Sequence, residues 1–322
     1  MADPVLLDHN ATTPVLPEVL DALLPWLREG FGNPSSDHPA GRRAREAVEA
    51  ARAEVGAVLG GAPEGVVFTG SGTEADNLAV LGTCGELSRG RVVTTAIEHP
   101  AVEEPCAHLE RRGIAVVRVR PGSDGRVPAE ALRAALSVDT VLASVMLANN
   151  ETGVIQPVGE VGSAARSLGV PVHTDAAQAV GRVPIDVAAL NVDLVTVVGH
   201  KIGAPKGVGA LWVRPGRRLV PLLLGGGQER GLRPGTENVA GIVALGTACR
   251  IARRDLADRV ARSSAARDRL ERILRDGVPG LRITGEGAPR LCNTLHVRFP
   301  GITGPALLAR ARGVAARSTR RR

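Results

Sequence analysis

The chain has 322 residues, of which 44% are hydrophobic and 2% aromatic, and its formal net charge is +7. That length suits one large domain and a smaller one around a sizeable core. Residues 309–322 hold six arginines and no acidic residue, so the rest of the chain is nearly neutral. A basic end with almost no aromatic side chains to stack on bases argues against nucleic-acid binding.

Cysteine usage and hydropathy limit the cellular setting. The four cysteines, Cys84, Cys106, Cys249 and Cys292, are scattered and form no C-x-x-C pair. This spacing fits neither a zinc site nor a disulfide framework and is typical of a reducing compartment. We find no secretory signal and no apolar run of the ~20 residues that a membrane helix needs. We therefore expect a cytoplasmic protein with no metal site and no membrane contact.

The N-terminal part predicts one strand and two helices. Residues 5–13 read V-L-L-D-H-N-A-T-T, a short strand running into small polar residues. Prolines then open a helix that ends at Leu27. After a glycine-rich turn at residues 30–36, apolar residues recur at helical spacing from Ala40 to Leu59. That spacing predicts an amphipathic helix with a charged outer face.

A candidate anion site follows. The strand Val66–Thr69 leads through Gly70-Ser71-Gly72-Thr73 into a helix over residues 74–87. Small residues between a strand and a helix start allow backbone N–H groups to close around an anion. The letters G-S-G-T-E-A also match the loose dinucleotide pattern, with Glu98 as the acid expected on the ribose. We therefore predict phosphate binding and leave the kind of phosphate open.

The middle of the chain alternates strands with helices. Apolar runs and helical spacings alternate over residues 91–97, 101–111, 114–119, 129–136, 141–147, 158–168 and 170–174. Regular alternation predicts an α/β fold with a mostly parallel sheet and helices on both faces.

Polar residues recur at the C-terminal ends of these strands. They are Thr73, His99, Asn150, Asp175 with Gln178, and His200 with Lys201. Any one of them alone could be a loop residue or a helix cap. In open α/β sheets, however, that edge is where ligands bind. We therefore expect these side chains to converge on one site.

The lysines are the most informative of these residues. Only two occur, Lys201 and Lys206, between an apolar run at residues 194–198 and a second β-type run at 208–213. Arginine keeps its proton in proteins, whereas a partly desolvated lysine can lose its proton and attack a carbonyl. A lysine, a strand-end aspartate, a histidine and a phosphate cradle together are what pyridoxal phosphate requires.

The remaining sequence predicts a loop, a long helix and a small strand pair. Residues 225–238 are too glycine-rich for a core, and 240–274 read as one long helical stretch. A strand pair at 281–284 and 294–299 and a last helix at 305–311 follow. We expect an N-terminal segment at 1–15 that joins the small domain, a large domain at 16–250 and a small C-terminal domain at 251–322.

The order of motifs resembles the class V aminotransferases and, within them, the cysteine desulfurases of the NifS/IscS kind. The motifs are A-T-T, G-N-P-S-S, S-G-T-E-A-D-N, E-H, N-N-E-T-G, D-A-A-Q, G-H-K, P-K-G-x-G-A-L and R-P-G-T-E-N, within residues 5–310. The resemblance implies a fold-type I homodimer that uses pyridoxal phosphate. It also implies conversion of L-cysteine or a similar amino acid, with sulfur passed to an acceptor or an iron–sulfur scaffold protein.

The resemblance assigns roles around the cofactor ring. Lys201 matches the lysine that binds the cofactor aldehyde, and Asp175 matches the partner of the pyridine nitrogen. Gln178 matches the donor to the ring hydroxyl oxygen. His99 matches the imidazole that stacks on the ring and relays protons.

The resemblance also assigns contacts at the cofactor's edge. Thr73 and His200 match contacts to the phosphate, and Asn150 matches a contact on the substrate side or to the ring. Thr236 matches a phosphate contact from the other subunit, which implies that residues 225–238 are a dimer element.

Two departures from the family pattern bear on activity. Val198 stands where the family has a phosphate-binding serine, so one hydrogen bond worth ~1–3 kcal/mol is lost. After residues 307–316 the sequence gives neither the loop cysteine that takes up sulfur nor the arginine that binds the substrate carboxylate. We therefore expect cofactor binding to persist and persulfide formation on this chain to fail.

Three alternatives stay open. The first is a related class V lyase or aminotransferase that needs no loop cysteine. The second is a non-catalytic subunit that pairs with a complete copy and lends it Thr236. The third is a dinucleotide-binding protein that uses residues 70–75, which leaves Lys201 and Asp175 unexplained.

Overall fold

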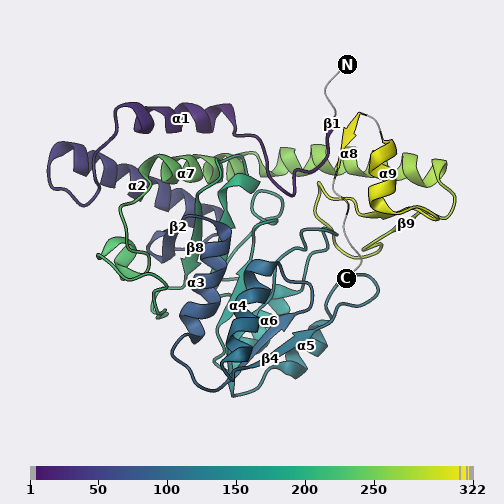
Figure 1. Cartoon of the computed structure of the whole chain (residues 1–322), viewed down its shortest axis with the longest axis horizontal. Helices are drawn as coiled ribbons and strands as arrows, with labels where there is room; N and C mark the ends of the chain where they lie inside the picture. Colours follow the sequence, from purple (N-terminus) through teal and green to yellow (C-terminus); the bar gives the residue numbers. More distant parts are fainter. Residues whose placement is uncertain (1–4, 312, 317, 319–322) are drawn as a thin grey trace.

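A computed structural model describes residues 5–311, 313–316 and 318. Its centre is a seven-stranded sheet that is parallel except for β8, which runs antiparallel to both neighbours (Figure 1). The strands, in spatial order, are β2 (Val66–Thr69), β8 (Gly209–Val213), β7 (Leu194–Val198), β6 (Val172–Asp175), β5 (Thr140–Ser144), β3 (Arg91–Thr95) and β4 (Ala115–Val119). The predicted α/β class with a mostly parallel sheet is confirmed.

Strand β8 runs antiparallel because of its short connection to β7. Only the one-turn 3-10 helix η2 (Gly199–Lys201) and a turn separate the two strands. A parallel return needs a crossover of a dozen or more residues, whereas an antiparallel return does not. The candidate lysine therefore sits on a tight connection between two buried strands.

Helices cover both faces of the sheet, as the alternation of strands and helices predicts. One face packs against α3 (Gly72–Cys84) and α4 (Pro100–Arg111), which share an apolar cluster with Val67, Val92 and Leu211 of the strands. The opposite face packs against another set, namely α2 (Pro39–Val58), α5 (Ala129–Ala135), α6 (Val158–Ser167) and α7 (Val239–Arg254). Because successive strand residues point to opposite faces, both clusters are continuous across the sheet.

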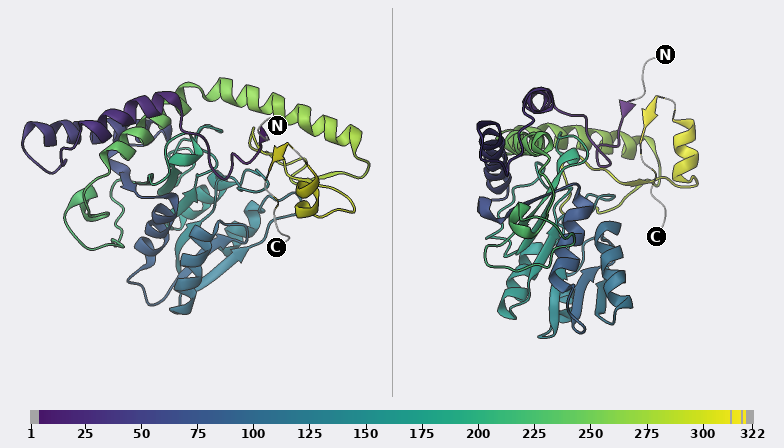
Figure 2. Two further views of the ribbon diagram at one scale, coloured as in Figure 1. Left: turned by 45° about the horizontal axis from the view of Figure 1, so that its top comes forward. Right: turned by 60° about the vertical axis from the view of Figure 1, so that its left-hand side comes forward.

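The long helical stretch differs from the sequence prediction. The chain forms two helices, α7 and α8 (Leu256–Gly277), that meet at Asp255, whose φ of −101° and ψ of 11° are not helical. The two helices follow one another along the top of the molecule (Figure 1). Helix α7 packs against α1 (Pro17–Arg28) and α2, whereas α8 extends beyond the sheet (Figure 2). The expected single helix is therefore wrong at this one position.

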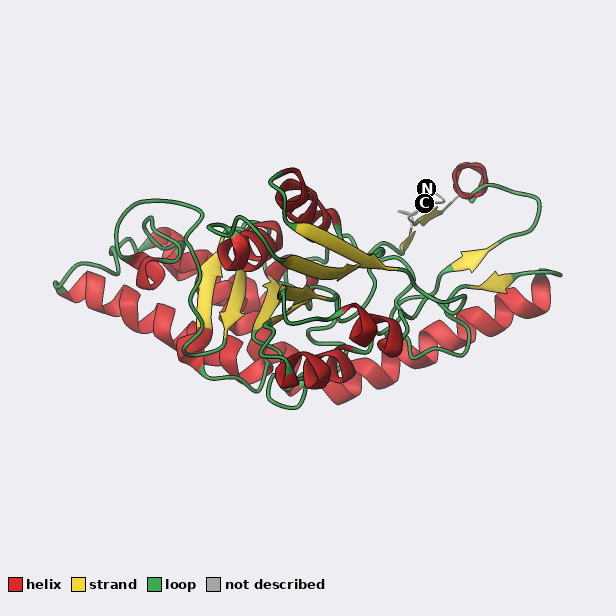
Figure 3. Ribbon diagram, turned by 90° about the horizontal axis from the view of Figure 1, so that it is seen from below, coloured by secondary structure: helices red, strands yellow, loops and turns green. Residues whose placement is uncertain are grey.

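The smaller part of the molecule lies beside the far end of α8 (Figure 3). It contains β9 (Arg282–Ile283), antiparallel to β10 (Val297–Arg298), and helix α9 (Gly304–Arg310). The expected N-terminal strand is only β1 (Val5–Leu6), which pairs in parallel with β11 (Val314–Ala315). Most of the predicted arginine-rich end (Arg312, Arg317 and residues 320–322) lies outside the described residues.

Two further 3-10 helices, η1 (Pro63–Gly65) and η3 (Gln228–Gly231), belong to the connections around the sheet. Within the described ranges, no helix combines the length and the apolar character that crossing a membrane requires. The same residues contain no cluster of three side chains suited to hold a metal ion.

Candidate active site

Lys201 lies in η2, directly after the buried strand β7. Its Nζ donates hydrogen bonds to the carbonyl oxygens of Asn10 and Ala11, the latter at 2.8 Å. Thr13 donates its backbone N–H and its hydroxyl to the carbonyl of His200 at 2.9 and 3.0 Å. The polar end of the predicted N-terminal strand therefore crosses the sheet edge and binds the lysine segment. This tie explains why the strand itself is only two residues long.

Gln178 also forms a hydrogen bond with the carbonyl oxygen of Asn10. Its Nε2 donates to the oxygen of Asn10 at 2.9 Å, so one carbonyl accepts from both Gln178 and Lys201. Arg182 lies behind this pair and donates to the side chain of Gln178 at 3.1 Å and to the carbonyl of Lys201 at 3.2 Å. The amide and the amine are thus held side by side.

Asp175 ends β6 and is buried. Its Oδ1 accepts the backbone N–H of Ala177 at 2.8 Å, which turns the carboxyl toward the sheet edge. Burial raises the pKa of Asp175 to about 7, and the carboxyl of Asp76 adds to this rise. A cation placed beside this carboxyl restores its charge. That preference suits a protonated pyridine nitrogen.

Further buried acids lie near Asp175. Burial raises the pKa of Asp76 to about 7 and that of Glu98 to about 8. Each has one buried side-chain oxygen without a hydrogen-bond partner, Oδ1 and Oε2 respectively, in the described part of the chain. His173 lies 3.5 Å from Asp76, between hydroxyls of Ser144 and Thr196, and burial lowers its pKa to about 4. Burial thus favours the neutral form of the carboxyls in this polar interior.

The position of Glu98 is inconsistent with the dinucleotide alternative. That alternative needs Glu98 on an accessible ribose. The residue is only 6% exposed, and its Oε1 accepts from the hydroxyl of Thr95 at 2.6 Å and the N–H of Met146 at 2.9 Å. The motif at residues 70–75 therefore lacks the expected ribose partner, and its role as a phosphate cradle stays a prediction.

The first turn of α3 forms that cradle. Ser71 caps the helix by accepting the N–H of Glu74 at 3.1 Å, and Glu74 accepts the N–H of Gly70 at 2.7 Å. Thr73 is exposed at this helix start. A Cβ at Gly72 would lie 2.3 Å from Cγ2 of Val198, so only glycine fits there. Val198 therefore fills the cradle wall with an apolar group that donates no hydrogen bond.

The two histidines are oriented by neighbouring groups. His99 caps α4, with its Nδ1 accepting the N–H of Ala101 at 3.1 Å, so a neutral ring carries its proton on Nε2. His200 has its Nδ1 3.1 Å from the hydroxyl of Thr12. Burial lowers the pKa of His200, and the charges of Lys201 and Lys206 lower it further. A neutral His200 is therefore favoured at neutral pH.

The other two predicted residues lie on loops. The carbonyl of Asn150 accepts from the side chain of Asn10 at 3.2 Å, which joins the β5 strand-end loop to the N-terminal segment. Thr236 is exposed on the loop at residues 225–238. The same loop contacts the cradle through an ion pair of Arg233 with Glu74 at 2.8 Å. The role of Thr236 across a dimer stays a prediction.

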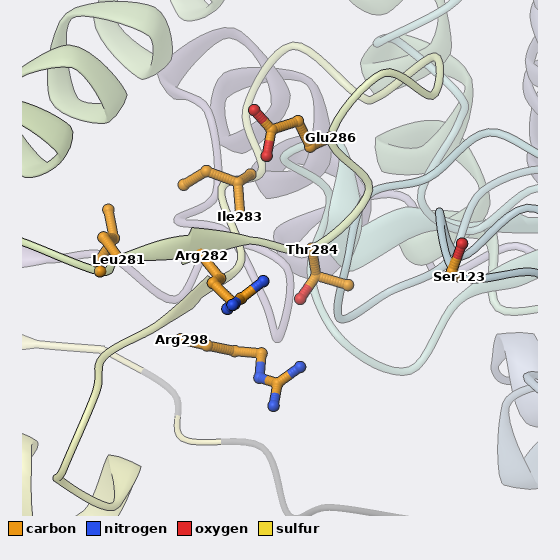
Figure 4. Close-up of a pocket in the computed structure, with 8 residues that line it drawn as sticks. Ser123, Leu281, Arg282, Ile283, Thr284, Glu286 and Arg298 are labelled. Atoms are coloured by element: carbon orange, nitrogen blue, oxygen red, sulfur yellow. The ribbon is translucent and has the colours of Figure 1, made fainter.

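A separate cavity of about 420 Å³ lies in the smaller part of the molecule. Its walls include Ser123, Arg282 and Arg298, and the two arginines lie next to each other (Figure 4). None of the predicted site residues lines this cavity, so we do not assign it to the active site.

Sequence reasoning missed several residues of this site. Asp76 stands inside the motif S-G-T-E-A-D-N and Asn10 directly before A-T-T, but neither chemistry nor spacing marks them. Arg182 carries no signal, because arginine is this chain's general cation. Their importance depends on burial and on contacts between distant segments.

The assembled groups fit pyridoxal phosphate. Lys201 offers an amine for the aldehyde, Asp175 a carboxylate for the ring nitrogen, and Gln178 an amide donor for the ring oxygen. The cradle at α3 offers backbone N–H groups and the hydroxyl of Thr73 for the phosphate. The poorest match is Val198, which supplies no donor.

Comparisons with known proteins agree with this chemistry. A model of the family "Aminotransferase class-V" matches residues 5–318. "Cysteine desulfurase 2" of Trichormus variabilis is 44% identical over 305 residues, which cover 94% of this chain and 76% of that protein. "Cysteine desulfurase IscS" of Anaeromyxobacter dehalogenans is 44% identical over 323 residues, covering 99% of this chain and 80% of that protein.

Solved structures show the same fold. A structure titled "NIFS-LIKE PROTEIN" matches with a TM-score of 0.92 at 38% identity, covering 97% of this chain and 86% of the other. "SspA in complex with cysteine" matches with a TM-score of 0.84 at 33% identity, covering 94% and 85%. The chain belongs to the class V aminotransferase family, whose enzymes depend on pyridoxal phosphate, and its cofactor is pyridoxal phosphate.

Proposed function

We propose that this protein is a transferase of the cysteine desulfurase type. Its substrate is L-cysteine or a similar amino acid, the carbon product is L-alanine, and the sulfur passes to an acceptor. The observation that carries the proposal is the convergence of the Lys201 amine and the Gln178 amide on the carbonyl of Asn10. The relatives named cysteine desulfurases support this choice of substrate.

The chain's residues divide the chemical work. When bound, pyridoxal phosphate supplies an electron sink for bond breaking at the substrate's α-carbon. Asp175 holds the ring nitrogen protonated, and Gln178 donates to the ring oxygen. Once Lys201 leaves the carbonyls of Asn10 and Ala11, its Nζ can move a proton at the α-carbon. Nε2 of His99 is the second proton carrier.

The sulfur-accepting thiol is not one of the four cysteines of this sequence. Burial raises the pKa of Cys84 and of Cys106 to about 12, and it raises the pKa of Cys249 as well. Cys292 is only 4% exposed. A buried thiol held in its protonated form is a poor nucleophile. An iron–sulfur scaffold or another sulfur-acceptor protein is the partner class we propose.

We further propose a cytoplasmic homodimer. Large apolar side chains are exposed on one chain, among them Phe31 at 90% and Leu224 at 92%. Exposed groups of this kind suit a protein interface. Within each chain, the proposed units are residues 1–15, 16–250 and 251–322. The pairing of β1 with β11 supports a link of the first unit to the third.

The visible absorption spectrum with pyridoxal phosphate, before and after L-cysteine is added, tests the proposal. We expect a bound-cofactor band that Lys201→Ala removes, a spectral change with L-cysteine, and alanine formed when an external thiol is present. Absence of the band would overturn the cofactor assignment. A band that responds to other amino acids but not to cysteine would favour a class V lyase or aminotransferase, which the buried thiols also permit.

A further inference from the structure

Arg182 is a buried cation whose hydrogen bonds, among the residues that the structure describes, go to Gln178 and Lys201. It is 7% exposed and lies four residues after Gln178, in the turn that follows β6. Its Nη1 donates to the backbone carbonyl of Gln178 at 2.8 Å and to the amide oxygen of the same residue at 3.1 Å. Its Nη2 donates to the carbonyl of Lys201 at 3.2 Å. One guanidinium therefore holds both residues that meet at Asn10.

This charge is kept inside the protein without an acidic partner. No ion pair between residues that the structure describes includes Arg182. Its pKa is lowered to about 10, mainly by burial, and Arg259 contributes to this lowering while Cys292 opposes it. The group thus stays protonated at neutral pH. Burying a guanidinium without a carboxylate is unfavourable for the fold, which argues that its position serves the site.

The contact with Gln178 decides which end of the amide faces the site. The two ends of a glutamine amide have nearly the same shape, so hydrogen-bond partners set its orientation. A guanidinium can only donate, so it requires the oxygen Oε1 on its own side. The Nε2 group is thereby turned toward the carbonyl of Asn10 and the edge where the cofactor binds.

We infer that Arg182 is a positioning residue for the cofactor. It locks Gln178 so that an N–H donor, not a carbonyl oxygen, faces the ring oxygen of pyridoxal phosphate. Through the same side chain it fixes the backbone carbonyl of Lys201. The inference rests on the proposed function, because it needs the cofactor in this site.

The consequence is an altered ring-oxygen acidity when Arg182 is lost. Without Arg182, only the hydrogen bond from Nε2 to the carbonyl of Asn10 still selects the orientation of the amide, so Oε1 is presented more often, and its lone pairs repel a deprotonated ring oxygen. The ring oxygen then holds a proton more tightly, and the pH midpoint of the bound cofactor's absorbance change rises. A shift of about one unit corresponds to the loss of a single hydrogen bond.

The experiment is a pH titration of the cofactor spectrum in Arg182→Met, Arg182→Lys and the wild type. We expect the midpoint of Arg182→Met about one unit higher and its affinity for pyridoxal phosphate about tenfold weaker. Arg182→Lys should recover at least half of the shift, because lysine also only donates. Arg259→Met is the matched control, an arginine beside the same turn that forms none of these contacts. Its midpoint should not move.

A double-mutant cycle with Gln178→Met isolates the mechanism. If Arg182 acts through the amide, Arg182→Met should shift the midpoint far less in that background. An unshifted midpoint in a folded Arg182→Met protein overturns the inference. Should Arg182→Met fail to fold, Arg182→Gln decides in the same way. A wild type without any cofactor band would instead overturn the proposed function.

Discussion

Two groups of buried ionisable side chains in this molecule differ in how their charges are compensated. In the first, Arg52 of α2 and Glu229 of η3 pair through both carboxylate oxygens at 2.8 and 2.9 Å, and Glu229 also accepts the N–H of Phe68. In the second, Asp76, Glu98 and Asp175 lie inside the same domain, and their pKa values are all raised by burial. The first pairs opposite charges, whereas the second is a group of acids whose charged form is disfavoured by burial.

The paired arrangement has a structural task. Glu229 and Arg230 have φ angles of 47° and 57°, a left-handed conformation that costs about 1–3 kcal/mol for each non-glycine residue. Although burial alone lowers the pKa of Arg52, the carboxylate of Glu229 outweighs it and the pKa is raised. Two charged hydrogen bonds therefore fix a strained turn and, with it, the loop at residues 225–238.

The unpaired arrangement has a chemical task. A buried carboxyl whose charged form is disfavoured destabilises the fold once it ionises, and it is stabilised by a protonated ring nitrogen placed beside it. The comparison indicates that buried charge in this fold is either compensated for stability or left uncompensated for binding. Substitutions at the two places should consequently change stability in opposite directions.

The largest effect is expected from Glu229→Gln. Removing one charge of a buried pair leaves Arg52 uncompensated, which costs about 3–5 kcal/mol of unfolding free energy. Urea unfolding measures the loss. The matched control is Glu49→Gln, which removes an exposed partner of the same arginine and should cost less than about 1 kcal/mol. Equal losses in both variants would remove the distinction between the two contacts.

The next effect has the opposite sign and depends on pH. Asp76 has a folded-state pKa of about 7 against an ordinary value of 3.8. Below pH 4 both states bind the proton, so Asp76→Asn leaves stability unchanged. Between pH 4 and 7 the unfolded state ionises first and the wild type loses stability, which asparagine avoids. The variant should gain about 2–4 kcal/mol over this range.

Unfolding curves at pH 4 and pH 8 measure this gain. Asp21→Asn is a suitable comparison, because Asp21 belongs to helix α1 and is exposed to solvent. A stability difference between Asp76→Asn and the wild type that is the same at both pH values would show that Asp76 is already ionised in the fold.

The sequence allows prediction of the polar residues at the edge of the sheet but not of the buried ionic groups in the interior. The sites at Thr73, His99, Asp175 and Lys201 follow from polar residues at strand ends, where topology fixes the location. The two buried arrangements do not follow, because burial is a property of the packed chain. Arg52 and Glu229 stand 177 positions apart, and no local pattern relates them.

The error in the fold has an equally local cause. The interruption at Asp255 falls within an alanine- and arginine-rich stretch whose helical spacing continues on both sides. The first strand, by contrast, is short as predicted, and the small polar residues D-H-N-A-T-T follow it. These polar residues bind the η2 segment and Thr294, contacts that only the tertiary structure provides.

A smaller effect is expected in the phosphate cradle from Val198→Ser. A serine hydroxyl can donate to the phosphate, so the affinity for pyridoxal phosphate should rise about fivefold or more. The valine packs against Gly72 and is 6% exposed, so the same change should cost about 1 kcal/mol of stability in the cofactor-free protein. Equilibrium dialysis and unfolding curves separate the two quantities. Val198→Thr, which keeps the branch at Cβ, should bind the cofactor similarly at a lower cost.

The smallest effect concerns the thiols. Because Cys84, Cys106, Cys249 and Cys292 are all buried, the folded protein should react with iodoacetamide slowly and nearly equally with and without L-cysteine. Mass spectrometry of the intact chain measures the alkylation, and the same chain in urea serves as the reactive control. Fast modification of one thiol in the folded state, or its protection by L-cysteine, would identify that residue as a sulfur acceptor. It would also show that the apolar core around this thiol becomes accessible to solvent in the folded protein.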